Sequence, residues 1–555
     1  MRSEPILIRK EENMTAARAI VECMKREGIQ KVFCVPGESY LPVLDALYDE
    51  QSIQLISARH EGGAAFMAEG YAKATLKPGV VLATRAVGGS NLAIGVHTAY
   101  QDSTPMVVFL GQVSSKFRGR EGFQEVDLDR YFQPITKWAV EITDPERTPE
   151  IVSRAFRIAQ TGRPGPVVVS LPEDILPVKA LMKFGPKLAP PRPAPSNQEL
   201  SQVKAHLLEA KKPIIIAGGG IKSARAERLL IEFAEKNKLP VLAAFRRHDV
   251  FPNQNKYYAG HLGLGAPKEV LETVREADVI LALGTRLSEV TTQDYTIISS
   301  SQKLIHIDID YDTIGKVYAP EVGIVADAKE TLRLLNELSM PINWEDWTLA
   351  RRQAYEKATD LKARRNDVIN RKVIEILKDK LPNDALLTND AGNFAGWLHQ
   401  FYTFKEKHTY IGPTSGAMGY GMPAALGAKL AFPTKQVVSL SGDGGFMMTV
   451  QELETAVRYQ IPIICLVFNN NMYGTIRMHQ EMHYPEKVIG TDLGQVSFKD
   501  LAISMGADGY VVNSPEEFAS AFDKALTKGR VAVIEIMTEL EQISVSQTIT
   551  GLRGK

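Results

Sequence analysis

The chain has 555 residues, of which 44% are hydrophobic and 23% charged, and its 65 basic side chains balance 65 acidic ones. This is the composition of an ordinary soluble globular protein with room for three or four domains. A net charge of zero provides no field to attract nucleic acid or an anionic membrane, and no segment reaches the roughly 18 consecutive apolar residues of a membrane helix. We therefore expect a soluble protein that acts on a small molecule, with no nucleic-acid or membrane partner.

The cysteines and the N-terminus favour the cytoplasm. Only Cys23, Cys34 and Cys465 occur, too far apart in sequence for a zinc knuckle or a disulfide framework. The first 15 residues, MRSEPILIRKEENMT, hold a short apolar patch between charges in place of a signal-peptide core. We expect an unprocessed cytoplasmic protein.

Two changes in composition divide the chain into three domains. The segment 185–197 contains five prolines, which favour an extended linker. The segment 338–367 has the pattern of a loop followed by a charged, solvated helix, and its position suggests a second connector. We expect domains at 1–185, 198–340 and 365–540, followed by a C-terminal tail at 541–555.

Within each third, short β-branched apolar runs alternate with stretches of helical periodicity, such as 61–74. These runs are too short for helices and are typical of buried parallel strands. Strands that alternate with helices predict an α/β protein with three doubly wound parallel-sheet domains. In chain order the clearest runs lie at 31–35, 80–84, 106–110, 167–171, 437–440, 463–468 and 531–536.

The last third contains a pattern that predicts a site for a metal and a phosphate. One apolar run enters Gly442-Asp443-Gly444-Gly445, a helical stretch follows, and a second run ends at Asn470. The carboxyl ends of parallel strands meet at one edge of a sheet, so Asp443 and Asn470 can converge. Carboxylate and amide oxygens suit Mg²⁺ or Ca²⁺, and the N–H groups that open a helix suit a phosphate. We interpret the pattern as a metal-bridged diphosphate site.

With its Asp and Asn 27 residues apart, this pattern resembles the thiamine diphosphate motif, and nearly the whole chain is similar to the acetolactate synthase-like group, which includes pyruvate oxidase and benzoylformate decarboxylase. The resemblance implies an N-terminal pyrimidine-binding domain, a central Rossmann-like domain and a C-terminal diphosphate domain. It implies thiamine diphosphate and Mg²⁺, with the metal on Asp443, Asn470 and the carbonyl of Met472. The other cofactor-binding residues that it implies are Asp390, Gly392, Asn393, Gly416, Met418, Gly442, Gly444, Gly445, Tyr473 and Gly474.

The segment 59–63, RHEGG, holds the residue that the resemblance makes catalytic. A zinc protease would need HExxH, and position 64 is alanine. By resemblance, Glu61 is the carboxylate that meets N1′ of the cofactor pyrimidine, and a raised pKa would suit that proton transfer. The resemblance also implies that Met418 wedges under the pyrimidine ring. Relatives place the glutamate of one subunit against the cofactor of another, which implies at least a homodimer and favours a homotetramer.

The central domain contains a glycine-rich turn at 214–221, IIIAGGGI. An NAD site would need an acidic residue at the end of the next strand, where Arg246-Arg247 stand, so NAD is not expected. Acetolactate synthases and pyruvate oxidases hold FAD on this domain, whereas other relatives bind nothing there. Arg163 and the run 284–286 resemble positions near that flavin, which leaves FAD as an open cofactor.

The residues near the substrate give a mixed picture. Phe123 and Gln124 match the acetolactate synthase segment that borders the reacting carbons. Glu38 follows Pro36-Gly37 where those enzymes have glycines, and it looks more like the acid of the simple decarboxylases. The run 288–290, Ser-Glu-Val, lacks the arginine that holds an acceptor carboxylate.

Two further departures leave the substrate open. His479 stands where the anabolic enzymes carry a tryptophan, and the loop 86–91 differs from the family's Gly-Pro-Gly-Ala-Thr-Asn. Branched-chain biosynthetic specificity is therefore not expected, and the donor is undetermined.

We predict decarboxylation of a pyruvate-like 2-oxo acid followed by carboligation, with Glu61, Gln124, Glu38 and Phe123 as the catalytic residues. Three alternatives stay open. The first is a 2-oxo acid decarboxylase that releases an aldehyde, and the second is a flavin-dependent oxidase. The third is a catalytically silent paralogue that only binds the cofactor.

Overall fold

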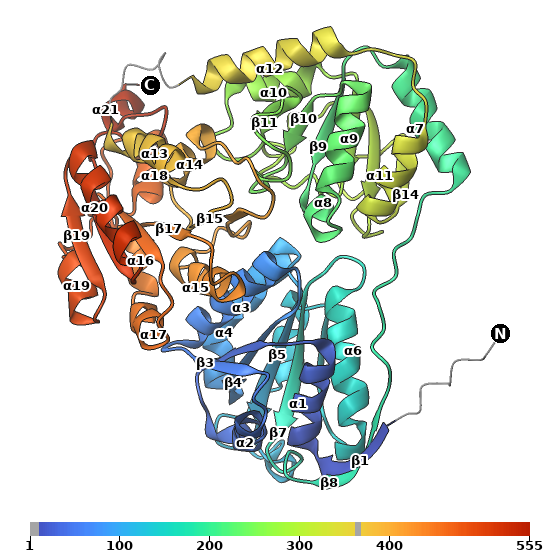
Figure 1. Ribbon diagram of the computed structural model, residues 1–555, viewed down its shortest axis with the longest axis vertical. Coiled ribbons are helices and arrows are strands. Elements are labelled where there is room, and N and C mark those ends of the chain that lie inside the picture. The colour runs from blue at the N-terminus through green and yellow to red at the C-terminus, as the bar shows by residue number, and fades with distance from the viewer. Residues whose placement is uncertain (1–9, 361–367, 555) are drawn as a thin grey trace. The chain divides into compact units, whose positions relative to one another are not determined.

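The computed structural model describes residues 10–360 and 368–554 (Figure 1). Within them the strands form three six-stranded sheets, each with all its pairs parallel, and one two-stranded antiparallel ribbon of β1 (Lys10–Thr15) and β8 (Lys179–Phe184). Helices connect the parallel strands, so the predicted class of three doubly wound α/β domains is confirmed.

The N-terminal sheet has the strand order β3-β2-β4-β5-β7-β6. Its runs of Val, Leu and Phe are buried on both faces, as parallel strands require. Alternate residues such as Val80, Val107 and Val167 pack with α1, α2 and α6, and α3 and α4 cover the other face (Figure 1). The strands are β2 (Lys31–Cys34), β3 (Gln54–Ser57), β4 (Gly79–Thr84), β5 (Met106–Gln112), β6 (Trp138–Glu141) and β7 (Pro166–Pro172). The helices are α1 (Ala16–Glu27), α2 (Leu41–Asp49), α3 (Glu61–Thr75), α4 (Arg85–Asp102), α5 (Leu128–Phe132) and α6 (Thr148–Gln160).

The central sheet has the order β11-β10-β9-β12-β13-β14. Numbered within the sheet this is 3-2-1-4-5-6, the order of the dinucleotide-binding fold. The strands are β9 (Pro213–Ala217), β10 (Val241–Ala243), β11 (Tyr258–His261), β12 (Val279–Leu283), β13 (Lys303–Asp308) and β14 (Val322–Val325). The helices are α7 (Asn197–Glu209), α8 (Gly219–Ser223), α9 (Glu227–Asn237), α10 (Lys268–Glu276), α11 (Ala328–Glu337) and α12 (Glu345–Thr359).

The C-terminal sheet has the order β16-β15-β17-β18-β20-β19. Its strands are β15 (Leu386–Asn389), β16 (Tyr410–Ile411), β17 (Val437–Gly442), β18 (Ile464–Asn469), β19 (Asp508–Val512) and β20 (Ala532–Met537). The helices of this part are α13 (Ile369–Lys380), α14 (Ala395–Phe401), α15 (Gly421–Ala431), α16 (Asp443–Met448), α17 (Glu452–Arg458), α18 (Gly474–His483), α19 (Phe498–Ser504), α20 (Pro515–Lys528) and α21 (Ile549–Arg553).

The chain separates into two compact units. The first unit comprises 1–191, 413–433 and 448–462, and the second comprises 192–412, 434–447 and 463–555. Helices α15 and α17 therefore belong with the N-terminal sheet, although they begin at residues 421 and 452 and the last strand of that sheet ends at residue 172.

The segment expected to be a tail after residue 540 is partly structured. Ile549 and Leu552 of α21 are buried and pack with Met472 and Ile543. Arg553 forms an ion pair with Glu481 of α18 at 2.8 Å. The end of the chain thus packs against the loop that holds the predicted metal ligands.

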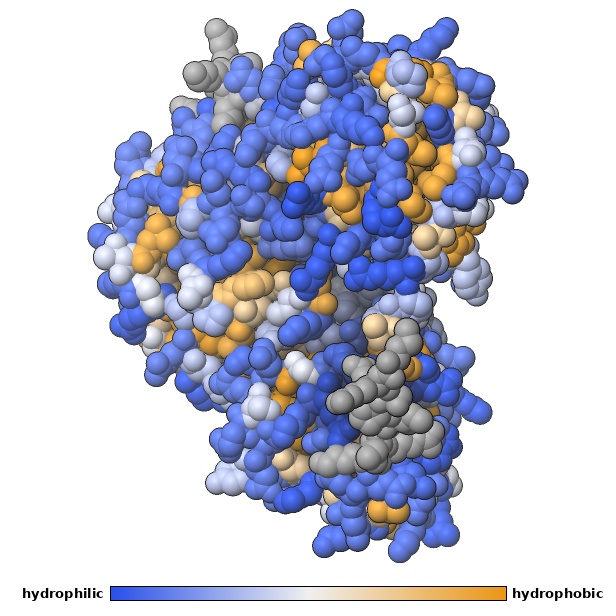
Figure 2. Space-filling model, turned by 45° about the vertical axis from the view of Figure 1, so that its right-hand side comes forward, coloured by the Kyte–Doolittle hydropathy of each residue, from blue (hydrophilic) through white to orange (hydrophobic). Residues whose placement is uncertain are grey.

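The three cysteines are free and buried. Within the described ranges, no helix has the length and apolar character needed to cross a membrane. The face drawn in Figure 2 is mostly hydrophilic, with apolar residues gathered in separate patches.

Candidate active site

The predicted metal ligands follow neighbouring strands in the second unit. Strands β17 and β18 pair along their length, Asp443 comes directly after β17, and Asn470 comes directly after β18. Asp443 Oδ1 accepts the N–H of Gly444 at 2.8 Å, whereas its buried Oδ2 has no hydrogen-bond partner among the described residues. Burial raises the pKa of Asp443, because the ionised carboxylate loses its hydration. A cation at this position would satisfy the free oxygen and reverse that shift.

The loop after β18 is held by backbone hydrogen bonds. The N–H of Tyr473 donates to the carbonyl of Thr491 at 2.8 Å, and that of Gly474 to the carbonyl of Met472 at 2.9 Å. Asn470 Oδ1 accepts the N–H of Met472 at 3.3 Å. In the part of the chain that the structure describes, no group of three or more His, Cys, Asp or Glu side chains could hold a metal. The predicted ligands at this edge are one carboxylate, one amide and one backbone carbonyl, a mixed oxygen set of the kind that Mg²⁺ prefers.

Glycines allow close approach of the chain beside Asp443. A Cβ on Gly444 would lie 2.5 Å from the Tyr473 ring, and one on Gly445 would lie 2.7 Å from Asp390 Oδ2. Any larger residue would displace these groups. Asp390 is fully buried and accepts the N–H of Ala391 at 2.8 Å.

The remaining diphosphate-side residues lie in the same unit. Asn393 donates to the carbonyl of Ile543 at 3.1 Å and accepts the Thr475 hydroxyl at 3.1 Å. Gly392 has a φ of 150°. The second unit thus contains all these predicted residues: Asp390, Gly392, Asn393, Gly442, Asp443, Gly444, Gly445, Asn470, Met472, Tyr473 and Gly474.

Glu61 lies in the first unit, at the first position of α3. Its Oε2 accepts the Asn91 amide at 3.0 Å. A Cβ on Gly88 would lie 3.1 Å from Oε1, so the carboxylate packs against the first turn of α4. The His60 ring caps α3 by accepting the N–H of Gly62 at 3.0 Å. Glu61 is thereby fixed at the carboxyl edge of the N-terminal sheet.

Arg85 joins the predicted substrate-side residues, and sequence reasoning missed it. Its guanidinium contacts Glu38 at 3.1 Å and Glu173 at 2.9 Å, and lies 5.9 Å from the centre of the Phe123 ring. Arg85 is 6% exposed, whereas the Glu38 side chain is 68% exposed. Its φ of 42° is strained for a residue with a side chain. Such strain at a strand end is the signal of a constrained site, and it is visible only in the structure.

Gln124 and the pyrimidine segment complete the residues of the first unit. Gln124 also has a positive φ, 64°. Gly416 is exposed and Met418 is half-buried. The segment that contains them is held further along α4 than Glu61 is: Ser415 binds Thr98 at 3.0 Å and the N–H of Thr414 donates to Asp102 at 2.9 Å, whereas Asn91 holds Glu61. Eleven residues of helix correspond to about 16 Å.

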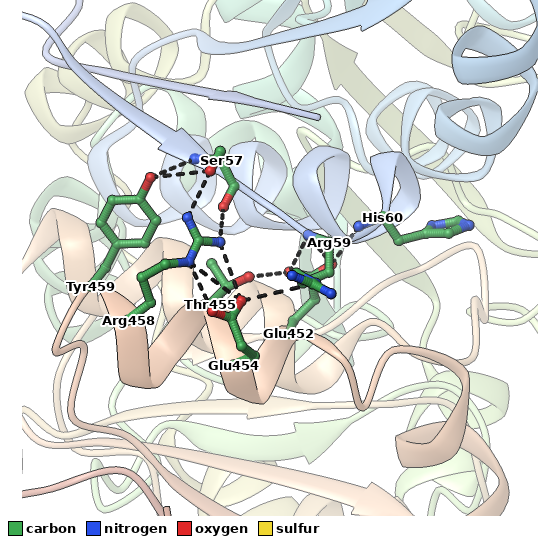
Figure 3. Close-up of polar contacts among 8 residues, drawn as sticks. All are labelled: Ser57, Arg59, His60, Glu452, Glu454, Thr455, Arg458 and Tyr459. Atoms are coloured by element: carbon green, nitrogen blue, oxygen red, sulfur yellow. Dashed lines mark hydrogen bonds and ion pairs between the residues drawn. The ribbon is translucent and has the colours of Figure 1, made fainter. Parts of the chain in front are cut away.

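A second missed residue is Glu452 of α17, which lies next to the residues before Glu61 (Figure 3). Its carboxylate is fully buried and accepts the N–H groups of Arg59 at 3.2 Å and His60 at 2.9 Å. An acid next to the apolar Leu453 and one turn before Ala456, on the face of a helix that is expected to be buried, was the available signal in the sequence.

Comparisons with known proteins define the class. Three family models match in chain order: "Thiamine pyrophosphate enzyme, N-terminal TPP binding domain" at 14–130, the central domain at 200–335, and the C-terminal TPP binding domain at 390–536. The chain belongs to the thiamine pyrophosphate enzymes.

Within that family, acetolactate synthases are among the close relatives. The chain is 34% identical to the "Probable acetolactate synthase large subunit" of Methanocaldococcus jannaschii, covering 95% of this chain and 92% of that protein. It is 33% identical to the acetolactate synthase large subunit of Lactococcus lactis, covering 99% and 96%, and 34% identical to that of Haemophilus influenzae, covering 97% of each. The resemblance inferred from the motifs is confirmed.

Proposed function

We propose that this enzyme decarboxylates a pyruvate-like 2-oxo acid and transfers the remaining acyl unit to a second carbonyl compound, as an acetolactate synthase would. The observation that carries the proposal is Asp443, whose buried, unpartnered oxygen lies at the strand edge beside Asn470. A bound cation would stabilise a buried carboxylate oxygen that has no hydrogen-bond partner, and Mg²⁺ often shares such ligands with a phosphate group. The names of the relatives support the carboligase assignment.

The residues of the chain fit the cofactor that the family implies. Thiamine diphosphate supplies a thiazolium carbon that can add to a ketone and accept its electrons as CO₂ leaves. Asp443, Asn470 and the carbonyl of Met472 would hold Mg²⁺, and the backbone at Gly444 and Gly445 would face the diphosphate. Glu61 would hold and return the proton at N1′ of the pyrimidine. Met418 and Gly416 would contact the pyrimidine itself.

We propose that a second copy of the chain completes the site. Asn91 holds Glu61 in the second turn of α4, whereas Thr98 and Asp102, towards the other end of that helix, hold Ser415 and Thr414 at the start of the pyrimidine segment. This separation favours a pyrimidine that lies on one copy and a Glu61 that reaches it from another. A homodimer is then the smallest active unit, and a homotetramer is its proposed extension.

The pair of Arg85 and Glu38 bears on the choice between the two reactions. A decarboxylase needs an acid near the cofactor to protonate the product, and Glu38 is the available group. The Glu38 carboxylate is already engaged in an ion pair with Arg85 at 3.1 Å. Phe123 lies beside that guanidinium, where it would border the reacting carbons. Carboligation therefore stays the first choice and decarboxylation the second.

FAD binding stays a separate proposal. The central sheet has the strand order that suits a dinucleotide. However, a Cβ on Gly218 would lie 2.1 Å from the carbonyl of Gly284, so close packing of the two loops already accounts for these glycines. A visible spectrum of the purified protein tests the proposal, since bound flavin is yellow.

The reaction is tested by incubating purified protein with thiamine diphosphate, Mg²⁺ and pyruvate, and identifying the products by NMR. We expect acetolactate. Acetaldehyde alone would establish the decarboxylase instead. An absence of turnover with pyruvate and with larger 2-oxo acids would contradict both proposals.

The role of Glu61 is tested by Glu61→Gln, which keeps the shape of the side chain and removes its acidity. We expect turnover to fall by about 100-fold or more, because general acid–base catalysis contributes factors of that order. Binding of the cofactor, followed by titration calorimetry, should change little. Unaltered turnover would exclude Glu61 as the catalytic acid.

A further inference from the structure

The connection from β3 to the catalytic carboxylate is held by one short helix, α17 (Figure 3). Arg458 donates to the hydroxyl and the carbonyl of Ser57, both at 2.7 Å. The Tyr459 hydroxyl, just after α17, accepts the N–H of Ser57 at 2.9 Å. These bonds fix the start of the connection, the last residue of β3.

Glu452 fixes the other end of the connection. One carboxylate accepts the N–H groups of Arg59 and His60 and the hydroxyl of Thr455, the last at 2.7 Å. The next residue after His60 is Glu61. Glu452 therefore binds the backbone of the two residues that immediately precede the catalytic acid.

The contact leaves no space for adjustment. A Cβ on Gly63 would lie 2.4 Å from Glu452 Oε1, so the first turn of α3 must have a glycine where it faces this carboxylate. An ordinary N-cap side chain accepts N–H groups in the first turn of its own helix. Glu452 instead comes from a segment nearly 400 residues away in sequence and binds the two residues that precede Glu61.

We propose that Glu452 is a positioning residue for Glu61: it holds the backbone before α3 so that the Glu61 carboxylate keeps its place against the cofactor pyrimidine. The inference rests on the role proposed above for Glu61. Glu452 does not touch the reacting atoms, and it acts through the position of the acid. Misplacement of a catalytic group by about 1 Å can cost about 100-fold in rate.

The protonation state of Glu452 gives the proposal a second readout. Burial raises its pKa to about 7, against the opposing effects of Thr455, the two N–H groups and Arg458. The charged and titratable residues that lie next to it are Arg59 and His60 on the connection and Glu454 and Arg458 on α17. An ionised carboxylate accepts stronger hydrogen bonds than a neutral one, so the hold is tightest above pH 7.

The test compares the variant Glu452→Gln with Glu454→Gln as the matched control. Glu454 lies on the same helix and pairs with Arg458, but its side chain is 35% exposed and accepts neither N–H group. We expect Glu452→Gln to lower kcat about 10- to 100-fold, with KM for pyruvate within about threefold. For the natural enzyme we expect kcat to fall below pH 7, and in Glu452→Gln this fall should disappear. Glu454→Gln should match the natural enzyme in kcat, in KM and in the pH dependence of kcat.

A readout without cofactor is amide hydrogen exchange in residues 57–63. Glu452→Gln should speed exchange there and leave the rest of the first unit unchanged. If Glu452→Gln fails to fold, Thr455→Val keeps the carboxylate and removes one hydrogen-bond donor to it. Because that hydrogen bond lowers the pKa of Glu452, the fall in kcat should then occur at a higher pH.

Three results would overturn the inference: unchanged kcat in Glu452→Gln, an equal loss in Glu454→Gln, or a pH profile that neither Glu452→Gln nor Thr455→Val alters. If Glu61→Gln abolishes turnover while Glu452→Gln does not, only this inference fails. If Glu61→Gln is active, the proposed function fails first.

Discussion

The N-terminal and C-terminal sheets share one strand order and differ in what stands at the strand ends. Numbered within each sheet, both orders are 2-1-3-4-6-5. The third strand is β4 in one and β17 in the other, and each runs directly into a helix. The residue that begins this helix is Arg85 after β4 and Asp443 after β17. The same place in the fold carries opposite charges.

This difference shows that the topology provides a position and the side chain decides its chemistry. Arg85 is paired with two carboxylates, Glu38 and Glu173, so its charge is balanced within the chain. Asp443 has a buried oxygen with no hydrogen-bond partner among the described residues, so a bound cation would stabilise its charge. We therefore predict that one sheet serves the substrate side and the other binds the metal.

The second strand of each sheet in chain order, β3 and β16, also occupies the same place and is followed by different functional residues. Strand β3 is followed by Glu61 and α3, and β16 is followed by the pyrimidine segment and α15. The two helices, equivalent in topology, pack closely in the first unit, since a Cβ on Gly427 would lie 2.0 Å from the carbonyl of Met67. The acid and the proposed pyrimidine cradle are thus two versions of one strand-to-helix connection.

The sharpest test of this comparison is Asp443→Asn. We expect Mg²⁺-dependent binding of thiamine diphosphate to weaken at least about 100-fold, since even supporting residues of metal sites contribute 10- to 100-fold. Stability without cofactor should not fall, because the neutral amide has a smaller desolvation cost than the carboxylate. Titration calorimetry and thermal unfolding measure the two effects. Asp384→Asn, an exposed acid of the same domain, is the control and should bind normally.

The second test uses pH to separate the two units. In the second unit, burial lowers the pKa of His261 to about 4, and it lowers those of the stacked His248 and His399 well below 6.5. Their contribution to stability is present above pH 6.5 and is lost as the pH falls toward 4. For His261 alone, about 2 kcal/mol should disappear between pH 6.5 and 5.

The buried acid of the first unit has the opposite sign. Because the pKa of Glu452 is raised to about 7, its contribution is present below pH 4.5 and is lost as the pH rises through 7. Urea midpoints measured across this range, with probes in each unit, should show the two opposite slopes. His261→Leu should reduce the acid slope of the second unit only, and an undiminished slope would contradict the assignment.

The smallest effect is expected for Arg85→Met. Its partners are partly exposed, so the pairs contribute little, and the variant should lose about 1 kcal/mol, or 2 to 4 °C in Tm. Cofactor binding should stay within about threefold, in contrast with Asp443→Asn. A loss of binding as large as that of Asp443→Asn would break the comparison between the two strand ends. Arg18→Met removes an exposed pair and serves as the control.

Much of the fold could be predicted from local pattern. Runs such as 106–110 and 437–440 are short, apolar and rich in β-branched residues. This is the composition expected of a strand that is buried on both faces of a sheet. The spacing of Asp443 and Asn470 predicted a shared edge, because parallel strands place their carboxyl ends together. The roles of the site residues and the domain boundaries stay predictions, as does the choice of substrate.

The sequence by itself determined the class of the protein, since strand and helix periodicities and the spacing from Asp443 to Asn470 can be read along the chain without knowing how distant segments pack. Only the tertiary structure decided which partners the charged side chains have: Glu452 binds the N–H groups before Glu61, and Arg85 pairs with Glu38. A charged residue in a string has many partners of suitable sign. Which of them it reaches depends on how helices from distant segments pack, and packing is set by the whole core.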